Sequence, residues 1–345
     1  MSAILAERVD IVIGVDAHTD THTAAILTRV GTVVAEQTVA ADPAGVSRLL
    51  SWVDELTGGQ RRAWVIDGAR SHGIGLVRQL RTTAETLIEA PRTKRRRGGK
   101  SDALDAAQVA RAALAASHTA IPRADGDREA LRILHVCRRH YTDTRTATVN
   151  LFKSLILTAD DELRGRLRGL SSRKQIRQAA FLAITTDLDT LAQVRREYLR
   201  ALAEQIITLD RLLADNLKQL RELVTAVCPA LLKQPGVGPV TAAIAYASWS
   251  HQGRCRNDAA YAALAGVNPI PASSGRTIRH RLNRGGDRTL NSALHIIAKT
   301  RIRTHPPTHA YIARRTAEGR NPKEINRCIK RYIARQLFRI MQAAA

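Results

Sequence analysis

Short apolar runs separated by tight turns open the chain. The runs are "IVIGVDAH", "THTAAILTR" and "TVVAEQTVA", joined by "TD" and by a turn at Gly31. Val, Ile and Thr concentrated between closely spaced turns are typical of paired strands. The pattern therefore predicts three antiparallel strands, one after the other, within residues 11–40.

Helical and strand patterns alternate after this meander. "DPAGVSRLLSWVDEL" has apolar residues at helical spacing and predicts a helix that starts near Pro43. "RRAWVID" predicts a fourth strand, "SHGIGLVRQLR" a helix, and "ETLIEAP" a fifth strand closed by Pro91. "SDALDAAQVARAALAA" predicts a further helix with Ser101 as its N-cap. This order indicates a mixed sheet covered by helices.

The remainder of the chain has an almost wholly helical pattern. In "LAQVRREYLRALAEQIITLDRLLADNLKQLRELV" the apolar positions recur at three and four, which favours a coiled-coil arm or a dimer contact over a long core helix. "LLKQPGVGPVTAAIAYAS" predicts a helix, a turn and a second helix, and the backbone amides at Gly236 and Gly238 could bind phosphate there. We expect three domains, over residues 1–125, 126–225 and 226–345.

The net charge of the chain indicates the kind of partner that it binds. The chain has 54 Lys and Arg against 31 Asp and Glu, a net charge of +23, which points to a polyanion such as nucleic acid, with a membrane surface as the lesser alternative. Residues 1–90 hold 8 basic and 11 acidic side chains, whereas residues 250–345 hold 19 basic and 4 acidic ones. This asymmetry predicts a catalytic or folding module first and a nucleic-acid-binding region later.

The N-terminal segment, the lengths of the apolar runs and the cysteine spacing argue against several classes of protein. No apolar run has the length of a bilayer span, and "MSAILAERVD" lacks a basic segment followed by a long apolar one. We therefore expect no membrane partner and a cytoplasmic, nucleoid-associated protein. The four cysteines stand far apart without CxxC spacing, which argues against a zinc site and a disulfide framework.

Four carboxylates stand out as candidate metal ligands. Asp16 and Asp67 end apolar strands of the expected sheet, and Asp102 and Asp105 lie three residues apart on the first turn of a helix. If they converge at one sheet edge, they can hold two Mg²⁺ ions at a phosphodiester. Their alternative role is to cap turns and to interact with the helix dipole.

Two histidines accompany the first of these acids. His18 and His22 follow Asp16 within six residues, but a turn between strands does not put both on one face as a helix would. We expect a structural or substrate-contacting role for them rather than metal ligation.

Two basic loops are candidate phosphate sites. The segment 92–100 contains six basic residues and runs directly into the acidic pair, which favours phosphate contacts near the metals. The loop "PASSGRT" places Ser273 and Ser274 near several arginines, and a serine hydroxyl in such surroundings can attack a phosphate or merely bind one. The candidate contacts in the two loops are Arg95, Arg96, Arg97, Lys100, Arg276, Arg279, Arg281 and Arg284.

Several of these motifs, taken in their order, resemble one known family. "IGVDAHTDTH", a fourth strand ending in an acid before Gly68, "KSDALDAAQVA", "PGVGPVTAAIA" and "LAGVNPIPASSGRT" followed by "RGGDRTLNSAL" are similar to DEDD transposases of insertion-sequence family 110. That family includes bridge-RNA-guided recombinases and Piv-type DNA invertases. The resemblance implies an α/β RNase H-like N-terminal domain of the Holliday-junction-resolvase type, a helical coiled-coil middle, and a mainly α C-terminal transposase domain with a helix-hairpin-helix-like element.

The resemblance also implies a chemistry. It makes Asp16, Asp67, Asp102 and Asp105 the Mg²⁺ ligands, although Asp67 stands where the family usually has the longer Glu. The family's nucleophile, a serine followed by glycine, corresponds to Ser274, with Ser273 as the less favoured neighbour. The expected product is a covalent phosphoserine link to DNA.

Partners follow from the same resemblance. They are donor and target double-stranded DNA, a structured guide (bridge) RNA, and further copies of the chain as dimers that assemble into a tetramer. Two alternatives remain: a metal-dependent nuclease or junction resolvase without serine chemistry, and a nucleic-acid-binding protein without catalysis.

Overall fold

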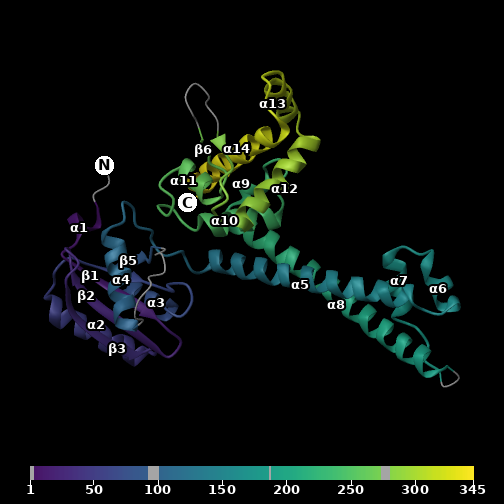
Figure 1. The fold of residues 1–345 in the computed structure, drawn as a ribbon, viewed down its shortest axis with the longest axis horizontal. Coiled ribbons are helices and arrows are strands. Elements are labelled where there is room, and N and C mark those ends of the chain that lie inside the picture. Colours follow the sequence, from purple (N-terminus) through teal and green to yellow (C-terminus); the bar gives the residue numbers. More distant parts are fainter. Residues whose placement is uncertain (1–3, 92–100, 186–187, 273–279) are drawn as a thin grey trace. The chain divides into compact units, whose positions relative to one another are not determined.

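The computed structural model describes residues 4–91, 101–185, 188–272 and 280–345. The chain divides into two compact units, residues 1–124 and 125–345 (Figure 1). Among the helices of the described segments, none combines the length and apolar character needed to cross a bilayer.

The first unit is a five-stranded sheet with four helices among its described residues. Its elements are α1 (Leu5–Arg8), β1 (Ile11–Ala17), β2 (Thr21–Thr28), β3 (Val33–Ala40), α2 (Pro43–Thr57), β4 (Arg62–Ile66), α3 (Ile74–Thr82), β5 (Thr86–Glu89) and α4 (Asp102–Leu114).

The sheet has the order β3-β2-β1-β4-β5. The pairs β1–β2 and β2–β3 are antiparallel, which confirms the predicted meander, whereas β4 and β5 run parallel to β1. The expected mixed α/β sheet is therefore confirmed. The helix predicted from "SHGIGLVRQLR" begins three residues late, at Ile74, because Ser71 and Gly73 donate backbone hydrogen bonds to the Gly68 carbonyl in a turn that precedes it.

Side chains of β1 alternate between two apolar layers. Ile13 and Val15 pack with α2 and α3 on one face of the sheet, and Val12 packs with α4 on the other. Because successive side chains of a strand point to opposite faces, Gly14 and Asp16 share the α4 face with Val12.

Gly14 sets how closely α4 approaches the sheet. A Cβ atom added at Gly14 would lie 2.0 Å from the Ala106 carbonyl oxygen and 2.9 Å from the Ala110 Cβ. Backbone atoms of a packed helix cannot yield to such a contact, so only glycine allows α4 to lie directly on β1.

A methyl group at this position is expected to be costly. Gly14→Ala should lower the free energy of unfolding by about 3 kcal/mol through overpacking, measured by denaturant titration. Gly75→Ala is the matched control, because Gly75 lies in α3 and nothing approaches its added Cβ within 4 Å. Equal unfolding midpoints for the two variants would contradict this description of the β1–α4 contact.

The second unit is mostly helical, as its sequence pattern predicts. Its elements are α5 (Asp127–Leu157), α6 (Asp161–Arg168), α7 (Ser172–Ala179), α8 (Thr190–Val227), α9 (Pro229–Leu232), α10 (Pro239–Trp249), α11 (Asp258–Leu264), β6 (Ile270–Pro271), β7 (His280–Arg281), α12 (Arg288–Thr304), α13 (Pro306–Ala317) and α14 (Pro322–Ala343).

The helices α5 and α8 pack along each other as a long arm, with α6 and α7 at its far end (Figure 1). Polar groups also join the two long helices. The buried Asn216 side chain donates to the Leu134 carbonyl at 2.9 Å, and Arg138 donates to the Leu213 carbonyl at 2.9 Å. Hydrogen bonds at such fixed positions favour one register of the pair.

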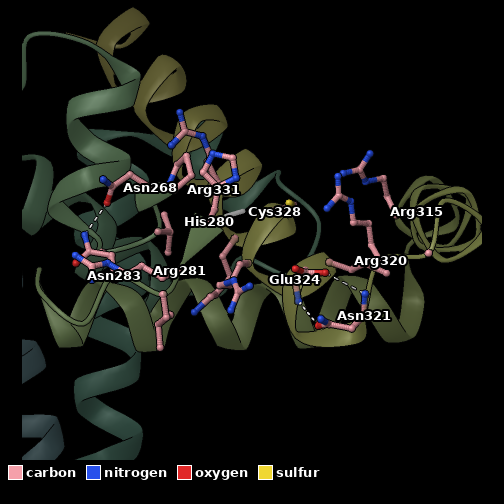
Figure 2. A pocket seen from close by; sticks show the side chains of 18 residues that line it. Asn268, His280, Arg281, Asn283, Arg315, Arg320, Asn321, Glu324, Cys328 and Arg331 are labelled. Carbon is pink, nitrogen blue, oxygen red and sulfur yellow. Dashed lines mark hydrogen bonds between the residues drawn. The ribbon is translucent and has the colours of Figure 1, made fainter. Parts of the chain in front are cut away.

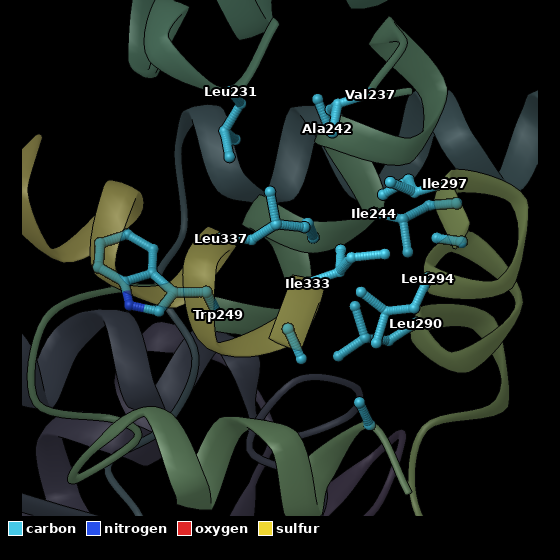
Figure 3. Close-up of a cluster of buried hydrophobic side chains, with 14 of the residues drawn as sticks. Leu231, Val237, Ala242, Ile244, Trp249, Leu290, Leu294, Ile297, Ile333 and Leu337 are labelled. Atoms are coloured by element: carbon cyan, nitrogen blue, oxygen red, sulfur yellow. The ribbon is translucent and has the colours of Figure 1, made fainter. Parts of the chain in front are cut away.

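The C-terminal helices enclose the largest apolar core of the second unit. Figure 3 shows Trp249 and Ile244 of α10, Leu290 and Leu294 of α12, and Ile333 of α14 in this core. All four cysteines are unpaired, and Cys228 is buried here, as expected for a packing residue.

Candidate metal centre

Asp16 lies near the carboxyl end of β1, on the face that α4 covers. Its side chain is 14% exposed. A strand of apolar residues carries the carboxylate to this position, and the absence of a side chain at Gly14 brings α4 against the same face. Asp16 is thus held at the junction of the sheet edge and the start of α4.

The first turn of α4 supplies two further carboxylates. Ser101 is the N-cap, as predicted, and its side chain accepts a hydrogen bond from the Leu104 amide at 3.3 Å. Asp102 is the first residue of the helix, and Asp105 follows on the same turn. Capping by Ser101 therefore fixes where the helix starts and with it the position of both acids.

The structure brings Asp16, Asp102 and His18 together. The His18 Nε2 atom lies 3.2 Å from Asp16 Oδ2 and 3.6 Å from Asp102 Oδ1. In each of the three residues, one possible ligand atom lies within 4.8 Å of those of the other two. Among the described residues, this is the single group of three or more His, Cys, Asp or Glu side chains that meets this condition. The sequence predicted Asp16 and Asp102 for this site, but it did not predict His18 as a third member.

The electrostatics of this group favour a bound cation. Burial raises the pKa of Asp16, and the negative charges of Asp105 and Asp102 raise it further, whereas His18 lowers it. An ionised Asp16 is therefore less stable in the folded chain than in water, and a cation among the carboxylates would offset that cost.

Asp67 lies at the neighbouring strand end. The parallel pairing of Val15 with Ile66 and the hydrogen bond from the Asp67 amide to the Val15 carbonyl, 2.9 Å, place it directly after β4 beside the end of β1. Its carboxylate is exposed and accepts a hydrogen bond from the Gly68 amide at 2.8 Å. Asp67 thus reaches the predicted edge but lies outside the group that Asp16, His18 and Asp102 form.

His22 is separated from His18, as the turn between β1 and β2 suggests. His22 pairs with Ala17 and lies two residues before Ala24 on β2. The side chains of His22 and Ala24 therefore point to the same face of the sheet, the face on which α2 and α3 pack. Its residue exposure is 2%, and burial lowers its pKa. A neutral buried imidazole suits a structural role, whereas His18 lies with the acids.

The chemistry of this donor group fits a divalent metal. Carboxylate oxygens are hard donors that suit Mg²⁺ or Mn²⁺, and an imidazole nitrogen is a better ligand for Mn²⁺ and later transition metals than for Mg²⁺. Asp16, Asp102 and His18 would hold such an ion directly, with Asp105 and Asp67 at the margin of the site.

Replacing His18 is expected to change metal preference. His18→Asn should weaken Mn²⁺ binding by about 10-fold and Mg²⁺ binding less, because the imidazole contributes more to the softer ion. Calorimetric titration of each metal measures both constants, and His140→Asn on the exposed surface of α5 is the matched control. Equal Mn²⁺ affinities for His18→Asn and the parent would contradict ligation by His18.

Much of the remaining candidate site lies outside the described residues. Ser273, Ser274, Arg276 and Arg279 belong to residues 273–279, and Arg95, Arg96, Arg97 and Lys100 belong to residues 92–100. Arg281 is the last residue of β7, and Arg284 follows it; both are exposed.

The glycine turn before α10 is only partly free to bind an anion. Gly236 has a φ of +76° and approaches the Ile297 carbonyl so closely that an added Cβ would lie 3.0 Å from its oxygen. The Gly238 amide, however, donates to the Thr241 hydroxyl at 3.0 Å, and the Val237 amide donates to the Gln234 carbonyl. The backbone amide of Gly238 is thus already satisfied within the turn.

Two family models match this chain. Residues 13–159 match one described as Transposase, of the DEDD type in insertion-sequence family 110, and residues 228–313 match one described as Transposase IS116/IS110/IS902 family. The first range contains all four candidate acids, and the second contains the serine loop.

A curated relative agrees with these matches. It is a probable family 20 transposase from Pseudomonas aeruginosa, 28% identical to this chain over 207 residues. The aligned region covers 57% of this chain and 58% of the relative, so it spans less than two thirds of that protein.

Proposed function

This chain belongs to the IS110 family of DEDD transposases, and we propose that it is an insertion-sequence transposase that cuts and rejoins DNA. The observation that supports this most is the meeting of Asp16 and Asp102 at one edge of the sheet, within 4.8 Å of each other through their nearest donor atoms. Two segments some 85 residues apart in sequence supply carboxylates to one point, as a metal-assisted phosphodiester reaction requires.

The acids act on the DNA phosphate. Asp16, Asp102 and His18 would hold one or two Mg²⁺ ions, and Asp67 and Asp105 would join them as ligands from the margin of the site. Positive charge from the ions would stabilise the phosphorane-like transition state. Asp16 is the ligand with the most restricted position, because burial and the β1 backbone hold it. The Gly68 amide engages one oxygen of Asp67, Oδ1, so the second oxygen is the one that would join the ligands.

The nucleophile in this proposal is the Ser274 hydroxyl. The Oγ atom attacks the phosphorus, its proton leaves to solvent or a basic group, and the bond between phosphorus and O3′ breaks. The released O3′ takes up a proton, so the products are a phosphoserine link and a free 3′ hydroxyl. Attack by that hydroxyl on the phosphoserine of another strand reverses the step and joins the exchanged DNA.

Family membership supports the wider assembly. In this proposal the first unit is an RNase H-like domain of the Holliday-junction-resolvase type, and the arm of α5 and α8 acts as a coiled coil between copies of the chain. Dimers assemble into a tetramer on donor and target DNA, and a structured guide RNA selects the sites. The reaction takes place on the nucleoid in the cytoplasm.

A covalent-adduct assay tests the proposed function. The protein is incubated with its element's end sequences, Mg²⁺ and RNA transcribed from the flanking DNA, and the products are then separated under denaturing conditions. We expect a protein–DNA adduct that protease digestion removes, together with joined strands. DNA cleavage without any protein–DNA adduct would contradict the proposal and indicate a metal-dependent nuclease without serine chemistry. DNA binding without cleavage would indicate a nucleic-acid-binding protein that lacks catalysis.

A further inference from the structure

A basic pocket lies at the C-terminal end of the second unit, far along the chain from the candidate acids. Its volume is about 850 Å³. It is formed by the loop after α11, the strand β7 and the residues after it, the turn between α13 and α14, and the first turns of α14 (Figure 2).

The charge of this pocket is strongly positive. Six basic side chains and one acidic side chain line it: Arg281, Arg315, Arg320, Arg327, Lys330, Arg331 and Glu324. The Glu324 carboxylate already accepts a hydrogen bond from the Asn321 amide at 3.2 Å in a capping box at the start of α14. Glu324 is therefore engaged in holding the helix terminus as well as facing the basic groups.

Several of the arginines have no ion-pair partner. Arg315 pairs with Glu318, but in the described segments no acidic group lies within 4.0 Å of Arg320, Arg327 or Arg331. Arg327 and Arg331 are four residues apart on α14, so their like charges repel on one helix face. Such a cluster costs stability unless an anion neutralises it.

Polar contacts fix the walls of the pocket. The Asn283 side chain donates to Asn268 Oδ1 at 2.6 Å, and the Lys330 ammonium group donates to Asn291 Oδ1 at 3.0 Å. Gly266 has a φ of +66° and lies so close to Gly285 that an added Cβ would meet its carbonyl oxygen at 2.3 Å. The two loops at the wall are thus locked together, which fixes the position of the strand β7 that follows the serine loop.

The serine loop begins and ends beside this pocket. β6 and β7 pair through Ile270 with Arg281 and Pro271 with His280, and the chain between these strands contains Ser274. His280 and Arg281 of β7 line the pocket themselves. Figure 2 shows Arg331 on their side of the pocket, and Arg315 and Arg320 on the other side, near the turn between α13 and α14.

We propose that this pocket binds the phosphodiester backbone of the DNA strand that Ser274 attacks, through Arg320, Arg327 and Arg331. The inference rests on the proposed function, which makes DNA the substrate of the serine loop. Unpaired guanidinium groups recognise consecutive phosphates without reading bases, so the contact positions the strand independently of its sequence. Neutralisation by DNA also removes the repulsion between Arg327 and Arg331.

Salt-dependent DNA binding tests this proposal. Arg327→Gln/Arg331→Gln in the full chain should bind a duplex of arbitrary sequence roughly 30-fold more weakly at physiological salt. The slope of log affinity against log salt should fall by about 2, since each phosphate contact contributes close to one unit. Fluorescence anisotropy of labelled DNA across a salt titration measures both quantities.

Matched variants separate this proposal from its alternatives. Arg211→Gln/Arg221→Gln removes the same charge from exposed positions of α8 and should change the slope by much less. The readout is DNA binding without cleavage, so the pocket can be tested even if the serine chemistry is wrong. An unchanged slope in Arg327→Gln/Arg331→Gln would overturn the proposal. A loss confined to RNA of matched length would also overturn it, because the pocket would then bind the guide.

Discussion

Asn in place of Asp16 is expected to lower DNA strand cleavage by on the order of 10³-fold while DNA affinity stays within about 3-fold of the parent. Asp16 is the most buried member of the metal group and lies 3.2 Å from His18 Nε2. An amide oxygen retains the shape but not the negative charge that holds a divalent ion. Cleavage of labelled DNA under single-turnover conditions and anisotropy of the same DNA measure the two effects.

The same substitution should make the metal-free protein more stable. Burial raises the pKa of Asp16, so the folded chain disfavours the ionised carboxylate relative to the unfolded chain. This penalty develops as pH rises from the carboxyl's ordinary pKa to its raised pKa in the folded chain. Asp16→Asn removes it, and the thermal unfolding midpoint should therefore rise in chelator and no longer respond to Mg²⁺.

Asp20→Asn is the control for both measurements. Asp20 is exposed in the turn between β1 and β2, close to Asp16 in sequence but outside the metal group. It should cleave DNA and respond to Mg²⁺ like the parent. Full cleavage by Asp16→Asn would contradict a metal role for this carboxylate.

Replacing Ser274 with Ala is expected to abolish the covalent protein–DNA adduct and to lower strand exchange by on the order of 10³-fold or more. Alanine has no oxygen to attack the phosphorus, whereas the acids and the basic pocket remain. Denaturing electrophoresis of labelled DNA measures the adduct, and sequencing of the joined strands measures exchange.

Ser273→Ala is the matched control because it removes a hydroxyl from the adjacent residue. It should retain adduct formation. Adduct formed by Ser274→Ala and lost in Ser273→Ala would move the nucleophile by one residue, whereas cleavage at the parent's rate in both variants would support a metal-dependent nuclease.

The strands and the antiparallel meander followed well from the sequence, whereas the sequence did not predict that β4 lies beside β1. Turn residues separate "IVIGVDAH", "THTAAILTR" and "TVVAEQTVA", and the observed meander uses these runs as β1, β2 and β3. Ser101 also caps α4 as expected, because an N-cap depends on neighbouring residues alone. Local patterns therefore specified both the sheet edge and the helix start at which the acids lie.

Local sequence patterns did not predict that His18 belongs to the metal group. Its position after β1 indicates a turn, and only the packing of α4 on Gly14 brings Asp102 within 3.6 Å of the imidazole. One signal was present: His18 is two residues from Asp16, so strand alternation continued by one step places both on the same face.

The basic pocket was missed for a similar reason. The serine loop and the C-terminal helix each looked basic, but Arg281 and Arg331 are 50 residues apart in sequence. The turn between α13 and α14 and the locked contact of Gly266 with Gly285 create the concave surface, and these tertiary contacts have no sequence pattern of their own.

Iron-mediated backbone cleavage tests the metal centre most directly. Fe²⁺ substituted into a Mg²⁺ or Mn²⁺ site produces hydroxyl radicals in the presence of ascorbate and peroxide, and these radicals cut the polypeptide next to the bound ion. Mass spectrometry of the full-length protein should find cuts near residues 16–18 and near 102–105, suppressed by excess Mn²⁺ and absent from Asp16→Asn. Cuts confined to other segments, or an unchanged pattern in Asp16→Asn, would contradict a metal centre formed by β1 and α4.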